Sequence, residues 1–178
     1  MLLELIKSGG FWGLVGVTLG VLLGEGSRYI RHRARIRKLK RIILEELKSI
    51  QAQIPQKIDI IKKIISALKK REMLGGISVR AFTVAYNQHI GELYEHLTLL
   101  ERNCLHVIYE KLRNADDVLF SLEEDFVTAV RDGIIKDPYA AFRDRLQDFL
   151  ENYRVTNKLI ESYLDGNPID VFHIPTPS

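Results

Sequence analysis

Two groups of residues in this chain have types and spacings that could carry chemistry. In the first group, Glu92 and His96 are four residues apart and could face the same side of a helix. Metal ligands in helical bundles have this spacing, but the bundle iron sites need a Glu-x-x-His pair from each of two helices, and the sequence has no second copy. We therefore interpret this group as a solvated polar face, and we predict no metal site and no cofactor.

The second group consists of Arg102, Asn103 and His106. An arginine followed by a polar residue, and by a histidine about one helical turn later, resembles the signature of the HEPN family of helical-bundle ribonucleases. The resemblance implies that Arg102 stabilises phosphate charge and that His106 transfers protons, without a metal. Three residues separate the two side chains, whereas the family pattern has at least four. Our main interpretation is therefore an arginine and a histidine that flank a core stripe, with no catalytic residue.

Other enzyme signatures are missing from the sequence. There is no Walker loop, no dinucleotide-binding glycine fingerprint, no GxSxG elbow and no HExxH. Cys104 is the single cysteine, which excludes an internal disulfide and fits a reducing cytosol. We predict that the protein is not an enzyme, with a metal-independent ribonuclease that uses Arg102 and His106 as the alternative.

The elements that would position these residues begin with an apolar segment. Residues 8–24 contain no ionisable side chain, and as a helix they span roughly 25 Å, against a hydrocarbon core of about 30 Å. A basic block with no acid follows, formed by Arg28, Arg31, Arg33, Arg35, Arg37, Lys38, Lys40 and Arg41. Cations beside a span resist translocation. The pattern therefore predicts a single-pass protein of the bacterial inner (plasma) membrane, with its N-terminus outside, its remainder cytoplasmic, and Trp12 and Tyr29 at the two interfaces.

Two other interpretations of the N-terminus are open. A secretory signal peptide carries its cations before the apolar run, whereas here only Lys7 precedes the run and the large charge block follows it. A buried helix of a soluble protein is the second alternative. Each glycine inside such a helix is less favourable than alanine by about 1 kcal/mol, whereas glycine is ordinary in membrane helices. The glycine content therefore favours the span.

The spacing of these glycines indicates self-association. Gly16, Gly20 and Gly24 are four residues apart on one helical face, and Gly9 and Gly13 form a second pair. This pattern lets helix backbones approach closely in lipid, although glycine is also simply common in membrane helices. We predict a homo-oligomer that packs through Gly13, Gly16, Gly20 and Gly24.

The positive charge of the chain is concentrated beside the apolar segment. Removing the eight cations of the basic block from the net charge of +3 leaves −5. The resulting basic collar comprises Arg28, Arg31, Arg33, Arg35, Arg37 and Lys38. The simplest partners are the lipid bilayer and its anionic lipids. Nucleic acid is the competing partner, and it is disfavoured because no aromatic stacking pattern is interleaved with the cations.

Apolar residues recur at steps of three and four through most of the remaining chain, which predicts helices. We expect one helix to end at Pro55, a long helix to begin near Ser78 or Ala81 and to run to about Arg113, and a break at residues 114–117. Gly133 should end the next helix, and the pair Asp137 and Pro138 should begin the last one. The predicted fold is all-α, with a transmembrane segment (1–26), a basic juxtamembrane helix (27–54), a cytosolic four- or five-helix bundle (55–165) and a proline-rich extended tail (166–178).

This layout has a wider resemblance. A short chain with an N-terminal membrane helix, an intracellular helical bundle and the motif of Arg102, Asn103 and His106 looks like the membrane accessory proteins of RNA-targeting CRISPR systems. The resemblance implies an oligomeric pore or membrane-perturbing accessory in antiviral defence, with a CRISPR effector or RNA as a further partner. A membrane-tethered ribonuclease and a membrane scaffold for a cytosolic partner are the alternatives, and a broad class of bacterial proteins with this layout fits equally well.

Overall fold

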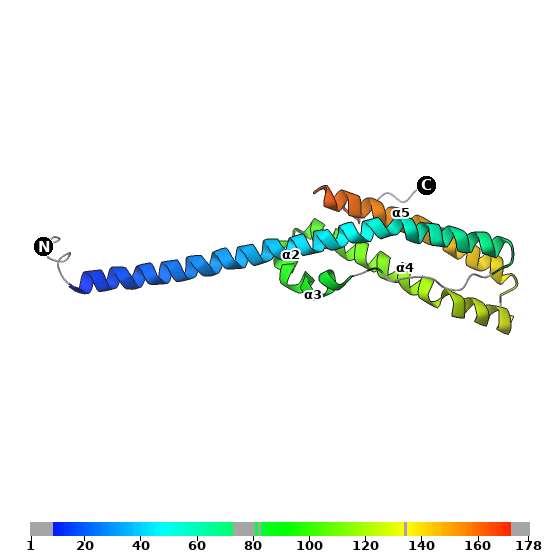
Figure 1. Cartoon of the computed structure of the whole chain (residues 1–178), viewed down its shortest axis with the longest axis horizontal. Coiled ribbons are helices and arrows are strands. Elements are labelled where there is room, and N and C mark those ends of the chain that lie inside the picture. Colours follow the sequence, from blue (N-terminus) through cyan, green and yellow to red (C-terminus); the bar gives the residue numbers. More distant parts are fainter. Residues whose placement is uncertain (1–8, 73–80, 82, 134, 172–178) are drawn as a thin grey trace. The chain divides into compact units, whose positions relative to one another are not determined.

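The computed structural model describes residues 9–72, 81, 83–133 and 135–171, without the side chains of residues 9–12, 14 and 15. All elements among these residues are helices: α2 (Gly9–Lys69), α3 (Val84–Leu93), the short 3₁₀ helix η1 (Tyr94–His96), α4 (Leu99–Asp132) and α5 (Pro138–Leu164) (Figure 1). The predicted all-α fold is therefore confirmed for the described part of the chain. The chain divides into two compact units, Met1–Arg41 and Ile42–Ser178.

The predicted transmembrane helix does not agree with the structure. Among the described residues, no helix is both long enough and apolar enough to cross a membrane. This finding contradicts the predicted single-pass placement in the bacterial inner membrane, with the N-terminus outside and the bundle cytoplasmic. Residues 1–8 and the side chain of Trp12 lie outside the described residues.

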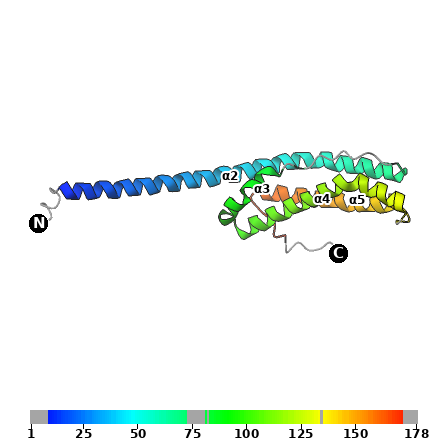
Figure 2. The same ribbon diagram turned by 90° about the horizontal axis from the view of Figure 1, so that it is seen from below.

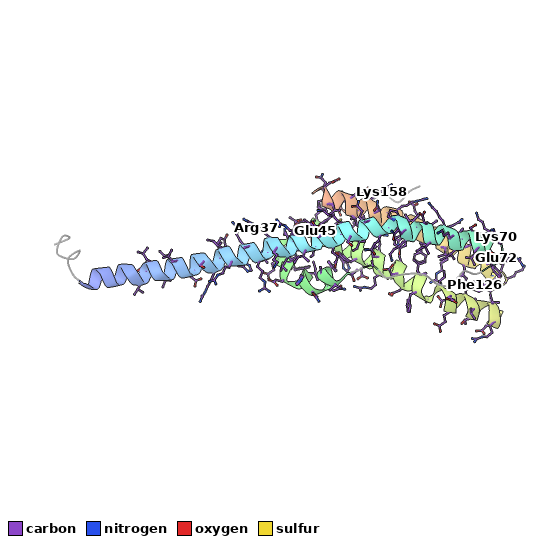
Figure 3. All side chains as sticks on the ribbon, viewed as in Figure 1. Arg37, Glu45, Lys70, Glu72, Phe126 and Lys158 are labelled. Atoms are coloured by element: carbon purple, nitrogen blue, oxygen red, sulfur yellow. The ribbon has the colours of Figure 1, made fainter. Side chains whose placement is uncertain are left out.

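The second unit is a helical bundle. In two perpendicular views, the second half of α2 lies alongside α4 and α5 (Figures 1 and 2). The stripe that α2 buries recurs at helical spacing and consists of Ile43, Leu47, Ile50, Ile54, Ile61, Ile64 and Leu68. The facing stripes of α4 and α5 include Leu105, Ile108, Leu112, Leu119, Leu122, Leu146, Leu159 and Ile160. Further along α4, the ring of Phe126, labelled in Figure 3, meets Phe142 edge to face at 5.4 Å.

Pro55 lies inside α2, although the sequence predicts that the helix ends there. Proline removes a main-chain donor and destabilises a helix interior by about 3 kcal/mol. Here Pro55 is exposed, while Ile54 and Ile61 on the buried face have almost no exposed surface. The helix continues because the apolar stripe packs on both sides of the proline, and packing outweighs local propensity.

The helix expected from Ser78 to Arg113 is replaced by α3, η1 and α4, and residue 78 itself lies outside the described residues. A capping box begins α4. The Thr98 hydroxyl accepts a hydrogen bond from the Glu101 amide at 3.2 Å, and the Glu101 carboxylate accepts one from the Thr98 amide at 2.6 Å. These reciprocal bonds satisfy two amides that a helix start leaves unpaired, so a new helix begins at this point.

The break expected at residues 114–117 is absent, and α4 runs through this segment to Asp132. Ala115 and Asp116 are buried there, which is why the polar run does not form a loop. The next two boundaries are confirmed. Gly133 follows α4 in the left-handed conformation, with φ 63°, and the Asp137 carboxylate caps α5 at the Ala140 amide, with Pro138 in the first helical turn.

A buried polar cluster joins the three long helices of the bundle. Lys57 of α2 donates to the Asp116 carboxylate of α4, which also accepts a hydrogen bond from the Tyr153 hydroxyl of α5 at 3.0 Å. The side chains of Lys57 and Asp116 are only 8% and 6% exposed. A buried charge needs such partners, because its desolvation is strongly unfavourable.

Candidate functional site

Arg102, Asn103 and His106 line one cavity. Its volume is about 280 Å³, and its walls are formed by Tyr86, Ile90, Tyr94, Arg102, Asn103 and His106. The last three residues lie on the first two turns of α4, whereas the other three come from α3 and η1. The structure therefore brings Arg102 and His106 together, and it adds an aromatic and aliphatic wall from a different element.

Arg102 is held in place by the residues that precede α4. Its Nε donates a hydrogen bond to the carbonyl of Leu97 at 3.0 Å, and its guanidinium carbon lies 4.3 Å from the centre of the Tyr94 ring. A guanidinium that stacks on an aromatic face keeps its charge and its planar orientation. Arg102 is therefore a cation of fixed orientation in the wall of the cavity.

His106 lies one helical turn after Arg102 and is exposed, while Asn103 is half-buried. An imidazole can give or accept a proton, and an amide offers both a donor and an acceptor. A fixed cation, an amide and an imidazole around one small cavity can bind an anion such as a phosphate group. This is the chemistry that the arrangement offers.

Glu46 of α2 holds the start of α3, which carries Tyr86 of the cavity wall. Its carboxylate accepts hydrogen bonds from the amides of Ala85 and Tyr86, at 2.6 and 3.0 Å, and from the Tyr109 hydroxyl at 2.8 Å. Thr83, at the start of α3, makes no side-chain capping bond, so Glu46 caps this helix in its place. The Tyr86 and Tyr109 rings stack at 3.8 Å, and burial, followed by the Glu110 charge, raises the pKa of Tyr86.

Sequence analysis missed Tyr86, Ile90 and Tyr94 as members of this site. Glu46 accepts hydrogen bonds from the start of α3, 39 and 40 positions away, and Tyr86, Ile90 and Tyr94 lie on α3 and on η1 directly after it; no local pattern reports such contacts. One signal was readable. Thr98 followed three residues later by Glu101 is the capping-box pattern, and it predicts that a helix begins just before Arg102.

Glu92 and His96 do not share one α-helix. Glu92 lies on α3, and His96 ends η1. Among the described residues, no group of three or more His, Cys, Asp or Glu side chains could hold a metal ion.

The glycine row lies in a part of α2 that we call the glycine arm, residues 16–24. A Cβ atom built on Gly13, Gly16, Gly20 or Gly24 would meet nothing within 4 Å. The apolar side chains of the arm are between 53% and 72% exposed: Val17, Leu19, Val21, Leu22 and Leu23. The arm is thus an apolar helix surface that the first unit itself leaves uncovered.

The residues of the predicted basic collar follow the arm on the same helix and form the basic segment, residues 27–41. Tyr29 is 57% exposed, and the guanidinium of Arg33 lies 5.1 Å from its ring centre. Arg31 Nε donates to the Ser27 carbonyl at 3.3 Å, and Arg28 pairs with Glu25 at 2.9 Å. Arg37, labelled in Figure 3, is likewise exposed.

Comparison of the chain with protein-family models, with curated proteins and with solved structures gives no match.

Proposed function

We propose that the chain is a non-enzymatic, self-associating helical protein whose copies join through the glycine arm. The observation that carries the proposal is the uncovered apolar surface of the arm, with five branched side chains more than half exposed. Contiguous exposed apolar surface of this kind is typical of interaction sites, because water disfavours it.

The arm has the shape that helix pairing needs. At 3.6 residues per turn, the glycine row lies between a leucine pair, Leu19 and Leu23, and a valine pair, Val17 and Val21. A second helix can approach the glycines closely and pack its side chains between these two ridges. The arm carries no charge, so a second copy meets no repulsion at this surface and presents the same shape in return.

The first prediction concerns the centre of the glycine row. Gly20→Ile adds a branched side chain where two backbones should meet, so association should weaken roughly ten- to a hundredfold. Gly26→Ile is the matched control. Gly26 is also open, with nothing within 4 Å of a built Cβ, but it lies about a third of a turn away from the row. Analytical ultracentrifugation of the full chain over a concentration series measures both constants.

Equal association of Gly20→Ile, Gly26→Ile and the wild type would refute the arm as the contact. A strictly monomeric wild type whose arm is instead protected from protease by phosphatidylcholine vesicles would assign the arm to lipid rather than to a second copy.

The pore and the CRISPR-linked antiviral role stay predictions. Both predictions were derived from a membrane-spanning helix, and none of the described helices is long and apolar enough to be one. Self-association through the arm requires neither the pore nor the antiviral role.

A second candidate function, a metal-independent ribonuclease, is favoured by one observation, the shared cavity of Arg102, Asn103 and His106. An arginine at a phosphate and an imidazole within reach are the groups that acid–base cleavage of RNA needs. Against it, the Leu97 carbonyl and the Tyr94 ring already hold Arg102 in a structural role.

The second prediction separates the two functions. Purified wild-type protein should not cleave single-stranded RNA in the presence of a chelator, and Arg102→Ala/His106→Ala should not differ from it. Cleavage by the wild type that His106→Ala abolishes, with the fold intact by circular dichroism, would make the ribonuclease the better assignment.

A further inference from the structure

Seven of the eight cations of the basic segment lie on two separate sides of one helix, and the eighth, Arg41, lies between them at the C-terminal end of the segment. At 3.6 residues per turn, one row contains Arg28, Arg31, Arg35 and Lys38. The other row contains Arg33, Arg37 and Lys40, nearly opposite the first. Glu25 is the nearest acid on the N-terminal side, and Glu45 is the nearest on the C-terminal side. The segment is thus an uninterrupted cationic rod about 20 Å long.

A narrow face between the two rows carries small or apolar side chains. Ser27, Ile30 and Ala34 follow each other at steps of three and four, so they lie along one line of the helix. All three are exposed, and each row of cations lies about a quarter of a turn to one side of them. From Ser27 to Ala34 the face is therefore smooth, with positive charge on both of its flanks.

A flat anionic surface can touch only one of these rows at a time. A groove with anionic walls touches both, because its two edges reach around the helix. The major groove of B-form DNA is about 12 Å wide, and a helix with its side chains is about 10–12 Å across. The major groove of an RNA duplex is too deep and narrow for side chains to enter.

We propose that the basic segment binds duplex DNA, with Ser27, Ile30 and Ala34 facing the floor of the major groove and the two cation rows on the two phosphate backbones. The small side chains allow the helix to approach the base edges, and continuous basic helices bind DNA in this way. The existing contacts of Arg28 and Arg33 are exposed, so phosphate can replace the Glu25 carboxylate and the Tyr29 ring at little energetic penalty. The proposal is independent of self-association.

The test measures binding of the full-length protein to a fluorescent 20-base-pair DNA duplex by anisotropy, over a series of salt concentrations. Binding should weaken by about a thousandfold between roughly 50 and 200 mM salt, as for six or more phosphate contacts. Arg28→Gln/Arg31→Gln/Arg35→Gln removes three of the four cations of one row, and Arg33→Gln/Arg37→Gln removes two of the three cations of the other. Each should weaken binding and reduce the logarithmic salt slope by about one unit per arginine.

Two matched controls separate this site from general positive charge. Lys63→Gln/Lys69→Gln/Lys70→Gln removes three exposed cations from the C-terminal end of α2 and the residue that follows it, and should leave the slope unchanged. Ala34→Trp keeps every cation but puts a large ring on the groove face, and it should weaken binding at least tenfold. Gly20→Ile, which targets the arm, should still bind DNA as a monomer.

Three outcomes would overturn the proposal. The lysine control could reduce the slope as much as either arginine variant does. Only one of the two arginine variants could weaken binding, which is the result expected for a flat anionic surface that touches a single row. The protein could also bind phosphatidylserine vesicles, with loss in both arginine variants, while showing no affinity for the duplex.

Discussion

At the scale of single residues, the bundle depends on a charged pair that is almost completely buried. Asp116 accepts hydrogen bonds from Lys57, from Tyr153 and from the amide of Ala81. It therefore connects α2, α4, α5 and the chain just before α3 through one carboxylate. Such a group fixes the register of helices that could otherwise slide along their apolar stripes.

The third prediction follows from this cluster. Lys57→Met leaves the Asp116 carboxylate buried without its cation, which should lower the free energy of unfolding by about 3 kcal/mol or more. Lys48→Met is the control, because Lys48 and Glu45 form an exposed ion pair, and such pairs contribute less than about 1 kcal/mol to the free energy of unfolding. Urea denaturation followed by circular dichroism measures both. Equal losses in the two variants would show that the buried pair has no special role.

At the scale of the elements, helix starts explain how the Arg102 cavity is assembled. α3 is only ten residues long, and its first amides are capped by Glu46 of α2, whereas α4 begins with its own capping box. A short helix has little stability of its own. The aromatic wall of the cavity is therefore held through α2, and its cationic wall is held locally by Thr98.

The fourth prediction tests the capping box. Thr98→Ala removes the hydroxyl that accepts from the Glu101 amide, so the free energy of unfolding should fall by about 1 kcal/mol. Thr83→Ala is the matched control, because the Thr83 hydroxyl precedes α3 without capping it, and its effect should stay within about 0.5 kcal/mol. Thermal unfolding ranks the two variants. A larger loss for Thr83→Ala would reverse the assignment of the caps.

Local signals predicted some of these elements and missed others for a physical reason. Gly133 and Pro138 act through the conformation of their own backbone, and the Asp137 carboxylate acts on an amide three residues away, so the end of α4 and the start of α5 were readable from the sequence. The polar run around Asp116 suggested a loop, because the sequence does not show that Lys57 of another helix pairs with Asp116. Similarly, Arg102 and His106 were found from their spacing, whereas Tyr86 and Tyr94 join them only through the packing of α3.

At the scale of the whole molecule, stability should depend on tyrosines that stay protonated. Burial is the main reason that the pKa values of Tyr109 and Tyr153 are strongly raised, followed by a hydrogen bond to Glu46 for Tyr109 and by the charge of Asp116 for Tyr153. In the unfolded chain both phenols titrate near pH 10. Above that pH the folded protein binds more protons than the unfolded one, so its stability must fall as the pH rises.

The fifth prediction gives this effect a slope. Each of the two tyrosines should lower the free energy of unfolding by about 1.4 kcal/mol per pH unit above about pH 10. Tyr109→Phe loses the hydrogen bond to Glu46 and should be less stable at neutral pH. Above about pH 10, however, its free energy of unfolding should fall less steeply than that of the wild type, by about 1.4 kcal/mol per pH unit. Urea titrations at several pH values measure the slopes. Parallel slopes for the wild type and Tyr109→Phe would mean that Tyr109 already ionises in the folded protein.

The pairing of Lys57 with Asp116 also has a consequence for biosynthesis. The two residues are 59 positions apart, and a ribosome that adds about 5 to 20 residues per second needs roughly 3 to 12 s to make the stretch between them. Throughout that interval the nascent chain carries the apolar stripe of α2, with an ammonium group in its middle, before α4 and α5 are complete. Because desolvation of an unpaired charge is unfavourable, we expect the lysine to oppose burial of the stripe until its carboxylate partner has been made. Once α4 has been made, the same charge favours one packing register of α2 and α4, because only the register that pairs Asp116 with Lys57 buries both charges together.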